Sequence, residues 1–186
     1  MLTTLEDEVI DKNSDIKMND KEFYSCKIVG LEFNNKSLKN SIFNECEFIH
    51  CNFSNTEFID LSIRASNFLN CKLLGLDLST LNSFFDNHFE DSQIKLTSFY
   101  QMKLSGIQFK NTDITESDFN STELKNAKFL NSDLRETSFD MAVLDKADFS
   151  TARNYLINPN NTSLKNAVFS LPEAISFLKA IGIKLK

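Results

Sequence analysis

Few side chains in this sequence could carry out catalysis. The chain has two histidines, His50 and His88, and they lie far apart in the sequence. A Ser or Cys nucleophile needs a histidine and a carboxylate within hydrogen-bond reach, and neither histidine has such a set beside it. The four glycines are scattered, so they cannot form a phosphate-binding loop. We therefore expect no catalytic residue and a protein that is not an enzyme.

The four cysteines are the next candidates for chemistry: Cys26, Cys46, Cys51 and Cys71. No CxxC or HxxxH spacing accompanies them, so we expect no metal and no cofactor. A secreted protein could pair them as disulfides. However, the N-terminus is acidic and lacks the basic and apolar regions of a signal peptide, and no stretch reaches the length of a membrane span. We expect a cytoplasmic protein, with no membrane partner, whose cysteines act as small buried hydrophobes.

Carboxylates are the most abundant charged groups. Asp and Glu number 26 against 20 Lys and Arg, which gives a net charge of -6. Direct binding of nucleic acid through a basic patch is therefore not expected, because it requires a surplus of cations. An acidic protein can still imitate nucleic acid, provided that its fold places the carboxylates on one side.

A period of five residues determines where these side chains lie. Phe, Leu or Ile occupies every fifth position from Phe23 to Leu78, which is 12 of 12, and again from Phe84 to Phe149, which is 14 of 14. These three residue types make up only 54 of the 186 residues, so the runs are not chance. Cys, Ser, Thr or Ala precedes the central residue by two positions in 17 of the 26 repeats.

A five-residue period fits neither a helix nor a simple strand, but it suits a chain that turns a corner every five residues. Four such sides make a square coil of about 20 residues, and stacked coils pair at about 4.8 Å. The 26 central residues then form about 6.5 coils. Residues 20 apart are stacked, as Cys26 and Cys46 are, and as Cys51 and Cys71 are.

The square coil separates the charges. Between residues 93 and 140 one adjacent pair of faces holds the acids Asp113, Glu116, Asp118, Asp133, Glu136 and Asp140. Across the break near residue 80 this side continues with Glu57, Asp60 and Asp77. Only Lys95 and Arg135 oppose the acids between 93 and 140, whereas the other two faces carry Lys103, Lys110, Lys125 and Lys128 against Glu123.

The nine acids form a candidate partner-binding surface. Asp113 stacks above Asp133. Like charges one coil apart are mildly destabilising, so their presence suggests that they are retained to bind a partner. The alternative is a solvated acidic surface that keeps a Phe-rich rod soluble.

One extra residue separates the two runs of repeats. It predicts a first β-helix subdomain at 16–78, a register break at 79–83 and a second subdomain at 84–169. Leu76, Met102 and Ile107 occupy small-residue positions nearby and should widen the coil. The break is either a functional hinge or a tolerated insertion without a role.

Both ends of such a rod need caps. Residues 1–15 predict a frayed tail or a small cap, and the repeat pattern lapses over 150–163. Residues 170–186 predict a capping helix in which Ser170 is the N-cap or the residue just before the N-cap, Pro172 lies in the first turn, and the helix stops at Gly182. Its surplus of apolar residues predicts a dimer contact through Ile175, Phe177, Leu178 and Ile181, unless the cap buries them itself.

Units such as NAKFL, NSDLR and KADFS resemble the pentapeptide-repeat family over most of the chain. The resemblance implies an all-β fold, a right-handed quadrilateral parallel β-helix with a C-terminal capping α-helix. The central Phe, Leu or Ile and the small residue would point inward, and the other three residues would point outward.

Within that family, the tail from DFSTARNYLINPNN to FSLPEAISFLKAIGI is similar to that of the quinolone-resistance (Qnr) and microcin-immunity (McbG) proteins. This resemblance implies a homodimer joined through the C-terminal ends that imitates DNA, binds type II topoisomerase (DNA gyrase or topoisomerase IV), and confers antibiotic resistance or immunity. The strongest quinolone protectors carry projecting loops, for which the unbroken period from Phe84 to Phe149 leaves no room. The alternative function is that of an interaction scaffold with no topoisomerase role.

Overall fold

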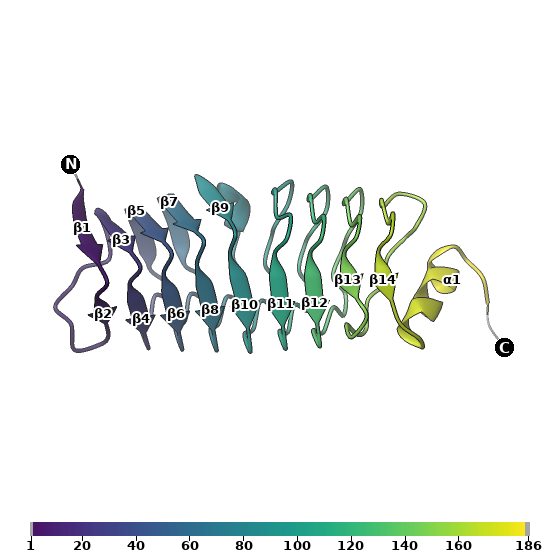
Figure 1. Ribbon diagram of the computed structural model, residues 1–186, viewed down its shortest axis with the longest axis horizontal. Coiled ribbons are helices and arrows are strands. Elements are labelled where there is room, and N and C mark those ends of the chain that lie inside the picture. The colour runs from purple at the N-terminus through teal and green to yellow at the C-terminus, as the bar shows by residue number, and fades with distance from the viewer. Residues whose placement is uncertain (1, 185–186) are drawn as a thin grey trace.

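The computed structural model describes residues 2–184 and shows a rod of stacked coils, with the N-terminus at one end and a short helix at the other (Figure 1). Residue 1 of the predicted N-terminal cap and residues 185–186 of the predicted C-terminal cap lie outside the described residues.

Two parallel sheets run along the rod. The first has five strands, which are β1 (Thr3–Glu6), β3 (Lys21–Tyr24), β5 (Ser37–Asn44), β7 (Glu57–Arg64) and β9 (Ser83–Phe85). The second has nine strands, which are β2 (Val9–Ile10), β4 (Lys27–Val29), β6 (Glu47–Ile49), β8 (Asn67–Leu69), β10 (His88–Glu90), β11 (Gln108–Lys110), β12 (Lys128–Leu130), β13 (Asp148–Phe149) and β14 (Val168–Phe169). Single bridges such as Asp113 to Asp133 connect the coils elsewhere. The predicted quadrilateral parallel β-helix with a helical C-terminal cap is thus confirmed.

The corners explain why the repeat has five residues. The residue two places after the centre has a positive φ in 24 of the 26 repeats, as at Asn55 (54°), Glu116 (61°) and Asn126 (58°). This left-handed conformation turns the chain once per repeat, and Asn tolerates it better than most residues. The fold therefore turns its corners with few glycines and only two prolines.

All 26 predicted centres are buried. Phenylalanines one coil apart stack nearly parallel, for example Phe48 on Phe68 with ring centroids 4.8 Å apart and Phe129 on Phe149 at 4.6 Å. Offset-stacked pairs of this kind add to the stabilisation from burial alone. The phenylalanines thus form a continuous ladder along the axis of the rod.

The small inward residues link successive coils. The hydroxyl of Ser117 donates to the carbonyl of Ile94 (2.7 Å), and that of Thr137 donates to the carbonyl of Ile114 (2.8 Å). Each cysteine occupies the same place; the Cys51 thiol donates to the Ile28 carbonyl at 3.4 Å. All four cysteines are free and buried, as predicted. Burial raises the pKa of the Cys46 thiol to about 12.

The pairing offset changes once within the repeats. Phe48 pairs with Phe68, 20 residues later, whereas Phe68 pairs with Phe89, 21 residues later. The extra residue lies beside the 3-10 turn η1 (Leu78–Thr80). The division of the rod into two subdomains there remains a prediction.

Both ends differ in part from the prediction. Of the two alternatives for the N-terminus, a frayed tail does not apply to residues 3–10, because β1 pairs with β3 and β2 pairs with β4. In the lapsed segment 150–163, Tyr155 and Ile157 are buried, so the stack continues although the pattern fails. At the C-terminus η2 (Glu173–Ile175) leads into α1 (Ser176–Ala180), and Gly182 follows with a positive φ of 83°.

The helical segment begins one or two residues later than predicted. Pro172 is the residue that begins the helical segment, and it makes no side-chain capping bond. The Ser170 hydroxyl instead donates to the Ser150 carbonyl, at 2.5 Å. The backbone carbonyl of Ser170, rather than its hydroxyl, bonds to the helix, where it accepts the amide of Ala174.

Candidate functional site

The nine predicted surface acids fall into two groups. Four of them accept hydrogen bonds from backbone amides two residues later, and we call them the turn acids: Asp77, Asp113, Asp118 and Asp133. The other five project without such a bond, and we call them the outward acids: Glu57, Asp60, Glu116, Glu136 and Asp140. Whether either group binds a partner remains a prediction.

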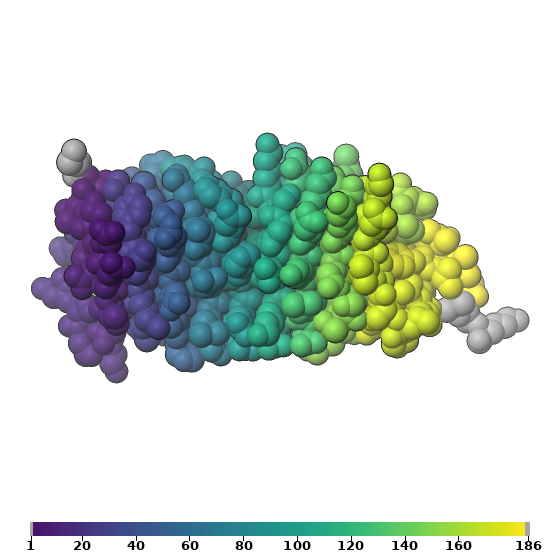
Figure 2. All heavy atoms as spheres, viewed as in Figure 1, coloured from purple at the N-terminus to yellow at the C-terminus, as the bar shows by residue number. Residues whose placement is uncertain are grey.

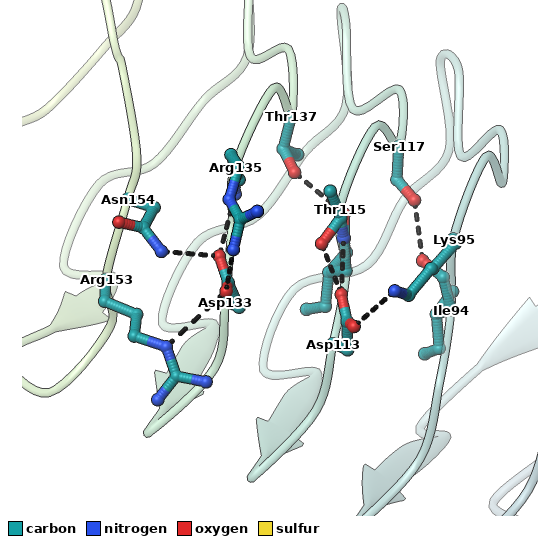
Figure 3. Close-up of polar contacts among 11 residues, drawn as sticks. Ile94, Lys95, Asp113, Thr115, Ser117, Asp133, Arg135, Thr137, Arg153 and Asn154 are labelled. Carbon is teal, nitrogen blue, oxygen red and sulfur yellow. Dashed lines mark hydrogen bonds and ion pairs between the residues drawn. The ribbon is translucent and has the colours of Figure 1, made fainter.

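Asp133 is buried and joins two coils (Figure 3). Its carboxylate accepts hydrogen bonds from Asn154 Nδ2 (2.9 Å) and from the backbone amide of Arg135 (3.2 Å). The Arg135 guanidinium lies 3.1 Å away and the Arg153 Nε 3.6 Å away. Burial raises the pKa of Asp133, but these hydrogen bonds and the Arg135 charge outweigh it and hold the pKa below its usual value.

Asp113 has a similar setting one coil away (Figure 3). Lys95 Nζ lies 2.7 Å from its carboxylate, and the amide and hydroxyl of Thr115 both donate to it. Burial again raises the pKa of Asp113, but the bonds from Lys95 and Thr115 and the Lys95 charge outweigh it, so the net shift is downward. The stacked pair of Asp113 and Asp133 is therefore compensated by cations within the chain, which removes the expected repulsion as a reason to invoke a partner.

Asp77 and Asp118 stabilise local turns. Asp77 caps η1 by accepting the amide of Ser79 (3.1 Å). Asp118 accepts the amide of Asn120 (2.8 Å) and the hydroxyl of Ser138 (3.2 Å). Along this column acids alternate with serines, because Asp77 pairs with Ser98 and Ser98 with Asp118.

The outward acids are exposed. Asp60, Glu116 and Glu136 occupy left-handed corners with φ of 50°, 61° and 59°. Glu116 and Glu136 lie on the same corner in successive coils, because the Glu116 amide bonds to the Arg135 carbonyl. Glu57 accepts the Ser37 hydroxyl and Asp140 accepts the Asn161 amide group, both at 3.0 Å and at the surface. These five carboxylates are available to a partner without disrupting a turn.

Sequence reasoning missed Arg153 and Asn154, which hold Asp133. They fall where the repeat pattern lapses, so they were not assigned to a face. One signal was present, because Arg153 follows Asp133 by 20 residues and the two form a bridge.

The two histidines do not meet. His50 lies at an exposed corner, whereas His88 lies in β10, where its Nδ1 accepts the amide of Gln108 at 3.2 Å. Within residues 2–184 no three His, Cys, Asp or Glu side chains form a group that could hold a metal ion. None of the helices described here is long and apolar enough to cross a membrane.

The predicted dimer residues at the C-terminal end have different surroundings. Phe177 packs on Phe169, with ring centroids 4.7 Å apart, and Ile175 is half-buried. Leu178 and Ile181 are 36% and 45% exposed. Leu171 and Ile183, which were not predicted, are exposed as well.

Known families match most of this rod. A model described as "Pentapeptide repeat region" matches residues 41–119, and one described as "Pentapeptide repeats (8 copies)" matches residues 115–150. Together they cover more than half of the chain. A search of curated proteins gives no significant match.

Two solved structures share the fold. A trypsin-treated variant of QnrB1, a plasmid-mediated fluoroquinolone resistance protein, matches with a TM-score of 0.56 and 15% identity over 100% of this chain and 98% of that chain. HetL, a pentapeptide-repeat protein involved in heterocyst differentiation regulation in Nostoc sp. strain PCC 7120, matches with a TM-score of 0.55 and 15% identity over 88% of each chain. At this identity the likeness concerns the fold alone. From the family models and the five-residue coil together, the chain belongs to the pentapeptide-repeat proteins.

Proposed function

We propose that this protein is a DNA mimic that binds a type II topoisomerase, DNA gyrase or topoisomerase IV, and protects it from quinolones or a toxin. The observation that carries the proposal is the row of outward acids along one side of a narrow rod. Glu116 and Glu136 are about 4.8 Å apart along the axis by the strand spacing. Successive phosphates of one DNA strand advance about 3.4 Å along the helix axis, which is comparable with the axial step between these two acids.

The proposal includes a homodimer joined through the C-terminal ends. The nine strands of the second sheet span about 38 Å at the usual spacing, so two rods end to end would reach roughly 80 Å. The exposed Leu178 and Ile181 supply apolar surface for that contact. The resistance role of QnrB1, which has the same fold, also favours it.

An interaction scaffold with no topoisomerase role is the second candidate. One observation favours it: the two most enclosed acids, Asp113 and Asp133, are already paired with Lys95, Arg135 and Arg153. HetL, which is involved in heterocyst differentiation regulation, has nearly the same TM-score as QnrB1.

A gyrase supercoiling assay, with and without a fluoroquinolone and with the protein titrated from substoichiometric amounts to excess, tests the proposal. Rescue of the poisoned enzyme supports protection, inhibition alone supports mimicry without rescue, and no effect at any dose supports the scaffold.

Charge-reversal variants locate the contact. Reversal at Asp113 or Asp133 would disturb ion pairs within the chain, so Glu116→Lys with Glu136→Lys is the better choice. We expect this double variant to bind gyrase at least tenfold more weakly at 0.1 M salt, mainly through slower association. Glu123→Lys, at an exposed position away from the acidic faces, makes the same charge change per residue and should alter affinity less than twofold. Equal losses in both variants would argue against an oriented acidic surface.

A further inference from the structure

The corner where the two acidic faces meet forms a continuous edge along the rod, which we call the acidic edge. Its residues follow one another in successive coils, in the order Asn55, Gly75, Leu96, Glu116 and Glu136. The amide of each of the first four donates to the carbonyl of the residue that precedes the next one, as Leu96 does to Thr115 at 3.2 Å. Glu116 and Glu136, the edge acids, therefore share one edge with Leu96, in the teal and green middle part of the rod (Figure 2).

Leu96 is an unusual residue for this edge. Its φ is 53°, and this left-handed backbone conformation is unfavourable for leucine, whereas Asn and Gly tolerate it. The side chain also gains little from burial, because it is 59% exposed. Among the left-handed residues that the structure describes, Met141 is the only other large apolar one. Neither backbone preference nor burial within the chain accounts for leucine at this position.

The neighbours of Leu96 on the acidic edge leave its side chain open. Toward the N-terminal end lies Gly75, which contributes no side chain, and a Cβ there would come 2.5 Å from Asn55 Oδ1. Toward the C-terminal end lies Glu116, which is exposed. Leu96 thus stands as an apolar projection between a position without a side chain and a carboxylate.

The charge beside Leu96 is negative, because the nearest cations are engaged by other acids. Lys95 precedes Leu96, but its Nζ lies 2.7 Å from the carboxylate of Asp113. The guanidinium of Arg135 is likewise 3.1 Å from the carboxylate of Asp133. Within residues 2–184 the edge acids form no ion pair, so their charge is available to cations of a partner.

We propose that Leu96 is an apolar anchor of the partner contact, and that it enters an apolar recess bordered by Lys or Arg side chains on the topoisomerase. The edge acids attract the cations, and they lie only about 5 and 10 Å from Leu96 along the axis by the strand spacing. A surface that pairs with both acids therefore covers Leu96 as well, and burial of its side chain is favourable only against apolar groups.

This inference rests on the proposed function and adds a contact that DNA does not offer. The outer edge of a DNA strand presents a row of phosphates, and its binding is dominated by charge. A leucine in line with the edge acids supplies a contribution that salt does not screen. The anchor would let the enzyme hold this protein after the charges have brought the two together.

Binding kinetics on immobilised DNA gyrase and, separately, on immobilised topoisomerase IV, between 0.05 and 0.3 M salt, test the proposal. Leu96→Asn places at this corner the residue type found at Asn55. We expect at least tenfold weaker binding through faster dissociation, with an unchanged salt dependence because no charge is altered. The Tm of this variant should be no lower than that of the unmodified protein, because Asn tolerates the left-handed backbone better than Leu. A purely structural role for Leu96 would not weaken binding while leaving Tm unchanged.

Two matched variants complete the test. Met141→Asn makes the same kind of change at the next corner of the coil, where Met141 is 70% exposed with a φ of 60°, and its affinity should change less than twofold. Leu96→Met keeps an apolar side chain of similar size, so it should bind within threefold of the unmodified protein.

The outcomes separate the two proposals. If neither enzyme binds the unmodified protein, the proposed function fails and this inference fails with it. If one enzyme binds, and Leu96→Asn binds as tightly as the unmodified protein or Met141→Asn loses as much affinity, only the anchor is overturned. A loss confined to Leu96→Asn, with affinity kept in Leu96→Met, supports the anchor.

Discussion

Replacing Asp133 with alanine should destabilise the rod, although Asp133 belongs to the predicted partner surface. The variant loses the bonds from Asn154 Nδ2 and the Arg135 amide, and a hydrogen bond to a charged group contributes about 1.5–3 kcal/mol. The two arginine side chains are 61% and 59% exposed, so their ion pairs contribute only about 0–1 kcal/mol each. We expect the free energy of unfolding to fall by about 3 kcal/mol, which lowers Tm by roughly 6–12 °C.

Urea and thermal unfolding followed by circular dichroism measure this loss. Glu136→Ala, at an exposed corner of the same coil, should stay within about 0.5 kcal/mol of the unmodified protein. The reasoning is refuted if Asp133→Ala is as stable as Glu136→Ala.

The pH dependence provides a second check on Asp133. Its pKa in the folded protein is lowered, so its stabilisation is fully present above the unfolded value near 4 and is lost as pH falls through the folded value. Asp133→Asn keeps the shape of the side chain without the charge. We expect this variant to be less stable than the unmodified protein at pH 7, and the difference to shrink as the pH is lowered below about 4. A difference that stays constant down to pH 2 would mean that the charge does not matter.

Two further predictions concern the ends and the core. The double variant Leu178→Ser with Ile181→Ser should be a monomer in light scattering, with little change in Tm, whereas Phe177→Ser should lower Tm because Phe177 packs on Phe169. A dimer that persists in the double variant contradicts the proposed contact. The four buried thiols should react with Ellman's reagent at pH 8 only after unfolding in urea, because they are buried and burial raises the pKa of Cys46 to about 12. Rapid reaction of the folded protein would contradict the burial of the cysteines.

The five-residue period predicts the core almost completely, because burial of Phe, Leu and Ile and the corner geometry both repeat with it. Residues 3–10 escaped prediction because they carry none of the phenylalanines, and their strand pairs with an offset of 18, as Thr3 with Lys21, rather than 20. Tyr155 escaped because it is displaced by one residue from the expected centre at 154. The 20-residue spacing places Arg153 in the coil next to Asp133. Whether the guanidinium contacts the carboxylate depends on how far a long side chain reaches, which the period does not encode.

The position of an acid within the repeat decides whether it can serve a partner. Just before the centre, a short Asp carboxylate reaches the amide two residues later, as in Asp118 to Asn120. An Asp there contributes to the turn, and removing or engaging it costs stability. Two residues after the centre, at the left-handed corner, the Glu116 amide bonds to the next coil, and the side chains of Glu116 and Glu136 lie in solvent. Counting charges on a face therefore overstates the surface offered to a partner. The acids at the corners are the ones whose reversal should change binding while leaving the phenylalanine ladder and the turns intact.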